Sequence, residues 1–114
     1  MTVCSIDIEL LNFMEIIHHY GFLYIDLKPD NICLLLKNFG KNNCANHLSL
    51  VDFGFSCKYV DKNNNHLSMN KSRKRYGNIS YSSLNALMGN SVSRKDDIES
   101  LCFILLYLWK GQLP

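Results

Sequence analysis

The sequence predicts an α+β chain that is mainly helical and contains one small β-hairpin. Apolar residues recur at a helical period near the N-terminus, a longer apolar run follows near the C-terminus, and two short apolar runs lie between them. With 114 residues, 47% of them apolar, the chain has room for one domain with a modest core.

The first apolar pattern predicts an amphipathic helix over residues 5–19. The positions that share the period are Ile6, Leu10, Phe13, Met14 and Ile17. Gly21 follows the last of them and is expected to end the helix. Residues 22–24 are then expected to be extended.

The hairpin is expected from residues 32–36 and 47–51, which read as two short strands. The polar residues 37–46, rich in Asn and Lys, are expected to form an enlarged loop between them. Asn31 precedes the first strand and Asp52 follows the second. Because the strands would be antiparallel, the sequence places both polar side chains at one end of the hairpin.

Residues 55–81 show no sustained period and are expected to form a long loop. Residues 82–88 are expected to form a short helix that Gly89 stops. Ser93 is a suitable N-cap for a final helix with Asp96 and Asp97 in its first turn. The apolar residues 98–109 of that helix favour burial and are too few to span a bilayer.

Bulk properties exclude several function classes. A net charge of +2 predicts no electrostatic field suited to nucleic acid or membranes. Five cysteines with no C-x-x-C pair predict neither a disulfide framework nor a zinc site, and we expect a cytoplasmic or nuclear protein without a signal peptide. The four histidines are interpreted as structural or solvated.

Two short motifs point to phosphoryl transfer. Residues 26–31 read DLKPDN and residues 52–54 read DFG. Each motif is weak alone, but in this order, each after an apolar run, they are typical of a protein kinase. Two polar turns in a helical domain without a site remain the plain alternative.

Phosphoryl transfer depends on positioning and charge neutralisation, and these residue types provide both. Asp26 is the candidate base that orients the substrate hydroxyl and accepts its proton. Asn31 and Asp52 offer the hard oxygen atoms that Mg²⁺ prefers, and Lys28 is the candidate cation for the transferring phosphate of ATP. Asp30 is interpreted as a solvated turn residue without a chemical role.

Pro29 and Gly54 belong to the same two motifs. Pro29 is expected to keep Lys28 out of helical geometry. Gly54 is either an ordinary turn glycine or a position where the site needs backbone freedom.

The chain resembles the C-terminal lobe of eukaryotic protein kinases, and within them the casein kinase 1 family looks closest. Residues 77–85, GNISYSSLN, are similar to that family's G-T-A-R-Y-A-S-I-N, in which S-I-N replaces the usual A-P-E. Residues 93–101, SRKDDIESL, are similar to S-R-R-D-D-L-E-S-L, and residues 110–114 are similar to R-G-S-L-P. The resemblance covers nearly the whole chain and is broken mainly at residues 37–46.

The resemblance implies that residues 1–114 form a partial protein kinase domain comprising the catalytic loop, the D-F-G motif, the activation segment and the central helix. It implies that Asp97 holds the catalytic loop's backbone from that helix, with structural support from Phe53 and Gly54. It also implies ATP and Mg²⁺ as cofactors and proteins as substrates.

Two departures from the family pattern stand out. The usual H-R-D is Tyr24-Ile25-Asp26, which keeps an aromatic ring to pack near Phe53 but removes a cation. Control by phosphorylation of the activation loop is therefore not expected. Ser80 stands where the family has an arginine for acidic or phosphorylated substrates. A basic cluster either substitutes for it or forms a solvated loop; its members are Lys71, Arg73, Lys74 and Arg75.

The sequence contains no G-x-G-x-x-G loop and no strand with an ATP-anchoring lysine. The resemblance implies that the N-terminal lobe and the helices after Pro114 are missing, so we expect the isolated chain to be inactive and poorly soluble. The leading hypothesis is a serine/threonine protein kinase of casein kinase 1 type, present as a catalytic-lobe fragment. The alternatives are a non-catalytic, pseudokinase-like binding module and an inactive truncated gene product.

Overall fold

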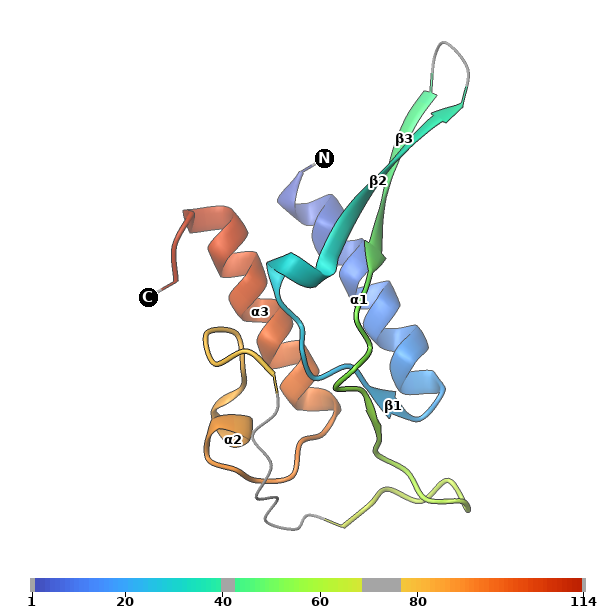
Figure 1. Ribbon diagram of the computed structural model, residues 1–114, viewed down its shortest axis with the longest axis vertical. Helices are drawn as coiled ribbons and strands as arrows, with labels where there is room; N and C mark the ends of the chain where they lie inside the picture. The colour runs from blue at the N-terminus through green and yellow to red at the C-terminus, as the bar shows by residue number, and fades with distance from the viewer. Residues whose placement is uncertain (1, 40–42, 69–76, 114) are drawn as a thin grey trace.

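Two long helices lie beside each other, and the remaining elements are arranged around them (Figure 1). A computed structural model describes residues 2–39, 43–68 and 77–113. The helices are α1 (Val3–His19) and α3 (Arg94–Lys110), and a hairpin projects beyond them. The mainly helical α+β class expected from the sequence agrees with this architecture.

Helix α1 confirms the first predicted helix and begins two residues earlier than expected. Its N-cap is Thr2, whose hydroxyl oxygen accepts a hydrogen bond from the Ser5 amide at 3.3 Å. The helix ends before Gly21, which has a φ of +80°. A Cβ at Gly21 would lie 2.7 Å from the side chain of Val60, so both the backbone and the packing require glycine there.

The hairpin consists of β2 (Ile32–Phe39) and β3 (Asn43–Leu50), paired antiparallel from Ile32–Leu50 to Phe39–Asn43. Its existence is confirmed, but the ten-residue loop expected at residues 37–46 is wrong because both strands continue into that stretch. Backbone pairing needs no apolar side chains. The outer half of each strand is mainly polar, so the pattern of apolar residues did not predict it.

Part of the segment expected to be a long loop takes part in strand pairing. Strand β1 (Phe22–Leu23) pairs antiparallel with β4 (Cys57–Lys58), and Val60 bridges His66. The prediction of a long loop over residues 55–81 is therefore wrong for its first part. The partner strand comes from a distant part of the chain, so no local period announces it.

The short helix α2 (Leu84–Leu87) confirms the helix expected at residues 82–88, and its N-cap is Ser83. Its capping hydroxyl also donates a hydrogen bond to Asp96 of α3 at 2.6 Å. Asp96 in turn accepts a hydrogen bond from the Ser93 amide at 2.6 Å. One buried carboxylate therefore closes the start of α3 and fixes α2 against it.

The main core lies between α1, α3, β3 and the segment after β1. Its buried members are Leu10, Met14, Tyr24, Leu27, Leu48, Leu50, Leu101 and Ile104. Burial of the apolar residues 98–109 is only partial, because the end of α3 is open and Trp109 is 72% exposed. Within the described residues, no helix has the length and apolar character to cross a bilayer.

Replacing Asp96 with alanine is expected to lower the free energy of unfolding by about 2–3 kcal/mol, because the buried Ser83 hydroxyl and the Ser93 amide lose their acceptor. Urea unfolding followed by circular dichroism measures this change. Lys95→Ala is the matched control: its ammonium lies 3.7 Å from the same carboxylate on an exposed side chain, and we expect an effect below about 1 kcal/mol. Equal losses in the two variants would contradict the role given to Asp96.

Candidate active site

The loop that follows β1 is held by a single buried carboxylate. Asp97 is 2% exposed and accepts hydrogen bonds from the backbone amides of Tyr24 and Ile25, at 2.9 and 2.8 Å. The imidazole Nε2 of His18 lies 2.8 Å from the same carboxylate. Asp97 thus links α1 and α3 to the backbone of residues 24–25, which is the contact that the family resemblance implied.

The backbone turns sharply at Ile25, which has a φ of +72°. The Asp26 amide donates to the Tyr24 carbonyl at 3.0 Å, which makes residues 24–26 a γ-turn of the rare, strained form. A positive φ is unfavourable for a β-branched residue, by about 1–2 kcal/mol. The two hydrogen bonds to Asp97 offset this strain.

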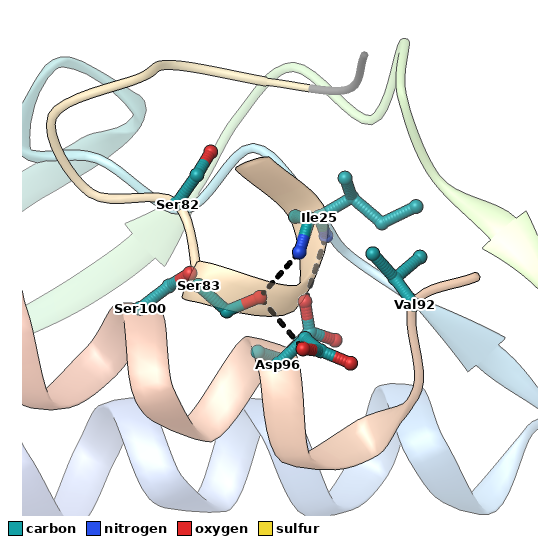
Figure 2. Close-up of a pocket in the computed structure, with 8 residues that line it drawn as sticks. Ile25, Ser82, Ser83, Val92, Asp96 and Ser100 are labelled. Carbon is teal, nitrogen blue, oxygen red and sulfur yellow. Dashed lines mark hydrogen bonds between the residues drawn. The ribbon is translucent and has the colours of Figure 1, made fainter. Parts of the chain in front are cut away.

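The Ile25 side chain is buried rather than turned to solvent. It packs in a small apolar cluster with Leu23 and Tyr59, against which Val92 lies. Beneath it, Ser83 and Asp96 line a cavity of about 10 Å³, which is the size of one water molecule (Figure 2). This packing leaves the turn without a charged side chain at its apex.

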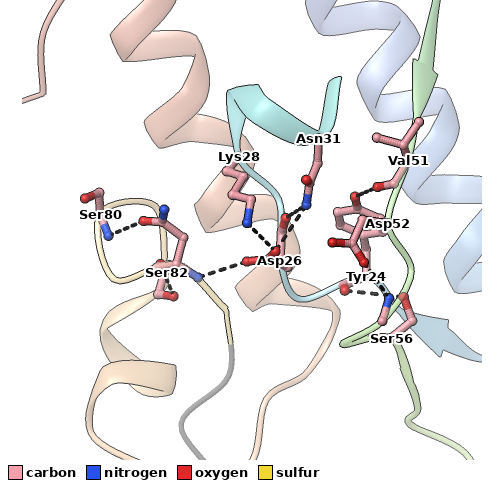
Figure 3. A network of polar contacts seen from close by, with 11 residues as sticks. Tyr24, Asp26, Lys28, Asn31, Val51, Asp52, Ser56, Ser80 and Ser82 are labelled. Atoms are coloured by element: carbon pink, nitrogen blue, oxygen red, sulfur yellow. Dashed lines mark hydrogen bonds and ion pairs between the residues drawn. The ribbon is translucent and has the colours of Figure 1, made fainter. Parts of the chain in front are cut away.

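Asp26 is 2% exposed, and its carboxylate is held by three donors (Figure 3). Oδ2 lies 2.8 Å from the Lys28 ammonium and accepts from the Asn31 amide at 3.1 Å. Oδ1 accepts from the backbone amide of Asn78 at 2.9 Å. Residues at positions 26, 28 and 31, which the sequence placed in one site, are therefore brought into direct contact.

Gly77 allows the Asn78 amide to approach Asp26. It has a φ of +74°, and a Cβ there would lie 3.1 Å from both Oδ1 of Asp26 and the carbonyl oxygen of Ile25. Sequence reasoning gave Gly77 and Asn78 no site role. The only available signal was their place in a stretch similar to the family's, because the contact joins segments 52 residues apart.

Lys28 has extended backbone angles, as expected for a residue before proline, and Pro29 begins the short 3₁₀ helix η1 (Pro29–Asn31). Its hydrogen bond to Asp26 is the main cause of a raised pKa for the Lys28 ammonium. Lys28 therefore carries a positive charge beside the buried carboxylate. Asp30 is exposed, in line with its interpretation as a solvated turn residue.

Asn31 is 5% exposed and has a fixed orientation. Its amide nitrogen donates to both the carbonyl oxygen and Oδ2 of Asp26, at 2.9 and 3.1 Å. Because the nitrogen is used in this way, the amide oxygen faces away from Asp26. That oxygen is the atom that a hard cation would bind.

Asp52 lies at the same end of the hairpin as Asn31, as the sequence predicts. The Val51 amide donates to the Asn31 carbonyl at 3.0 Å, which extends the β2–β3 pairing by one step. Asp52 has a φ of +60°, and its Oδ1 accepts from the Gly54 amide at 3.1 Å. A Cβ at Gly54 would lie 3.0 Å from that oxygen, so glycine leaves room for this turn.

Tyr24 connects the two motifs. Its hydroxyl donates to the Val51 carbonyl at 2.5 Å, and the Phe53 ring meets its ring edge-on with centroids 5.2 Å apart. The aromatic contact expected between positions 24 and 53 is therefore present. Burial, with added repulsion from Asp26 and Asp52, raises the pKa of Tyr24 to about 12.

The donor set fits a hard divalent cation with Asn31 and Asp52 as ligands, because both offer oxygen atoms at one end of the hairpin. Among the described residues, no three His, Cys, Asp or Glu side chains gather into a metal site. A cation here would therefore complete its coordination with water and phosphate oxygens, as Mg²⁺ commonly does.

Two further expectations concern the basic cluster and Ser80. The basic cluster of Lys71, Arg73, Lys74 and Arg75 lies outside the described residues. Ser80 is exposed, and its amide donates to the Asn78 side chain at 2.8 Å. The contact of His18 with Asp97 was not identified from the sequence, where all four histidines looked alike.

One comparison with known proteins bears on this geometry. The chain matches the family model described as the protein kinase domain, and the match extends over residues 3–114. It therefore includes both motifs, the segment around Asn78 and the whole of α3.

Gly77→Ala is expected to lower the free energy of unfolding by about 2 kcal/mol or more, because it adds a close contact with Asp26 to the strain of a positive φ. Gly111→Ala is the matched control: its φ is +77°, but a Cβ there has no neighbour within 4 Å. We expect Gly111→Ala to cost only about 1 kcal/mol in urea unfolding. A larger loss of unfolding free energy in Gly111→Ala than in Gly77→Ala would show that the contact with Asp26 does not contribute to the loss.

The raised pKa of Tyr24 predicts a stability loss at high pH. Below pH 10 the phenol is neutral in both states; above it the unfolded state ionises first, so stability falls as the pH rises from 10.0 to about 12. The stability difference between wild type and Tyr24→Phe should therefore shrink over this interval in urea unfolding. A difference that stays constant over this interval would contradict the role given to Tyr24.

Proposed function

Because this chain belongs to the protein kinase domain family, we propose that it is a serine/threonine protein kinase of casein kinase 1 type. It would transfer the γ-phosphate of ATP to serine or threonine hydroxyls of proteins, with residues 1–114 forming the C-terminal-lobe part of the domain. The observation that carries the proposal is the hydrogen-bonded unit of Asp26, Lys28 and Asn31, with Asp52 at the same end of the hairpin.

The carboxylate of Asp26 suits a base that positions a hydroxyl. An ionised carboxylate has about four acceptor sites, and the three donors from Lys28, Asn31 and Asn78 leave one for a substrate hydroxyl. These donors also fix the direction of the remaining site. Asp26 would therefore orient the attacking oxygen and accept its proton during transfer.

Lys28 and the two candidate cation ligands suit the phosphate side of the reaction. Asn31 and Asp52 would hold Mg²⁺, which neutralises charge on the phosphates when bound. The Lys28 side chain is 23% exposed at the edge of the site, so its ammonium is accessible to a phosphoryl group as well as to Asp26. This arrangement places positive charge where negative charge accumulates during transfer.

The casein kinase 1 assignment is supported by the sequence at residues 77–85 and 93–101. The apolar packing of Ile25 with Leu23 and Tyr59 supports a kinase whose catalytic loop is not regulated by a phosphate on the activation segment. No cation at position 25 is available for such a phosphate.

A non-catalytic, pseudokinase-like binding module is the alternative. It is favoured by Ile25, which stands at a position where the family usually has arginine. The two functions differ in whether the site binds a cation and whether Asp26 supports transfer.

Asp52→Asn is expected to weaken Mn²⁺ binding at least about tenfold, since removal of even an outer partner of a metal ligand has an effect of that size. Mn²⁺ serves as a paramagnetic substitute for Mg²⁺, and NMR line broadening at Asn31 and Asp52 measures its binding. Asp30→Asn removes the same charge from an exposed residue of the adjacent turn and should leave the affinity nearly unchanged.

Equal weakening in the two variants would contradict the assignment of Asp52 as a ligand.

Transfer of radioactive phosphate from ATP to a serine peptide separates the two functions. Transfer that disappears in Asp26→Asn supports the kinase, whereas the absence of both Mn²⁺ binding and transfer supports the binding module.

A further inference from the structure

A polar cavity of about 570 Å³ lies between the end of α1, the segment after β4 and the start of α3. Figure 1 shows the end of α1 close to β1, the strand that pairs with β4. The cavity is lined from these three elements by Glu15 and His19, by Tyr59 and His66, and by Arg94. The cavity is separate from the candidate active site, because its lining does not include Asp26, Lys28, Asn31 or Asp52.

Arg94 offers an uncommitted guanidinium group to this cavity. Its guanidinium carbon lies 5.1 Å from the centre of the Tyr59 ring, and among the described residues this is its one specific contact. Tyr59 is 8% exposed, and its hydroxyl donates to the His18 carbonyl at 2.6 Å. The platform beneath the guanidinium is therefore fixed, and the planar donor fork is available for a ligand.

His66 adds a second donor beside Arg94. Its ring centre is 5.4 Å from that of Tyr59, so His66 and Arg94 contact the same ring. Nδ1 of His66 lies 2.8 Å from the Leu67 carbonyl and must donate to it, because a carbonyl only accepts. Nε2 is the ring nitrogen left for a ligand, and it donates when the ring is protonated.

The opposing charges are few. Glu15 is the one carboxylate among the described lining residues. The carboxylate of Asp97 lies 2.8 Å from Nε2 of the lining residue His18 and is paired with it. The histidines do not form a metal site, because no suitable group of three ligands occurs in the described part of the chain. Among the lining residues that the structure describes, the free charge is therefore positive at Arg94 and negative at Glu15 alone.

We propose that this cavity binds a phosphoryl dianion, with Arg94 as its bidentate ligand and His66 and His19 as supporting donors. Arginine forms paired hydrogen bonds with phosphate oxygens, and imidazole provides single ones. The dianion is carried either by a phosphorylated serine side chain or by free inorganic phosphate, since both present the same oxygens. Glu15 limits the affinity by repulsion.

The test is an NMR titration of the 114-residue chain with inorganic phosphate and, separately, with a phosphoserine peptide and its unphosphorylated form. We expect phosphate-dependent shifts at the amides of Tyr59, His66 and Arg94. Arg94→Gln should weaken binding roughly tenfold, the effect of losing one charge-assisted pair. Lys95→Gln, the same charge change on the next residue of α3, should leave it unchanged.

Glu15→Gln provides a change of opposite sign, because it removes the repulsive charge and should tighten binding a few-fold. Tighter binding of the phosphoserine peptide than of inorganic phosphate identifies a phosphorylated protein segment as the ligand, and the reverse order identifies the free anion. Equal weakening by Arg94→Gln and Lys95→Gln, or no shifts around Tyr59, would overturn the proposal.

Discussion

The organisation of the molecule depends on the carboxylate of Asp97, which is buried and receives hydrogen bonds from two consecutive backbone amides and one imidazole. Its donors come from α1 and from the loop after β1, while Asp97 itself belongs to α3. Removing a buried acceptor of this kind leaves several donors without partners, which costs more than the bonds themselves contribute. The position of the loop that carries the candidate site is therefore set by a residue of α3 and not by the loop itself.

The candidate site contains two strained backbone positions. Ile25 and Asp52 both have positive φ values, of +72° and +60°, although neither is glycine. Such conformations persist where the surroundings determine them, and they gather at functional sites. At Ile25 the hydrogen bonds to Asp97 fix the turn, and at Asp52 the bond from Gly54 does so. Asp26 therefore follows a turn fixed by a buried carboxylate, and Asp52 belongs to an exposed turn fixed by its own hydrogen bond with Gly54.

Local sequence pattern predicted the elements whose signals are local. The period of apolar residues located α1, Gly89 marked the end of α2, and the capping residue Ser93 located the start of α3. The spacing of DLKPDN and DFG located the candidate site. The outer hairpin was missed because its strands are polar, and β4 was missed because its partner is distant in the chain. The contacts of His18 and Asn78 depend on segments more than 50 residues away, which no local pattern encodes.

The position of Trp109 has a practical consequence. It is the only tryptophan of the chain, lies at the end of α3 and is 72% exposed, with the Lys110 ammonium 5.5 Å from its ring centre. Intrinsic fluorescence therefore reports on the solvent around this end of the helix. A blue shift of the emission would reveal a protein or detergent covering that surface. Ligands at Asp26 would leave the signal unchanged and need a label of their own.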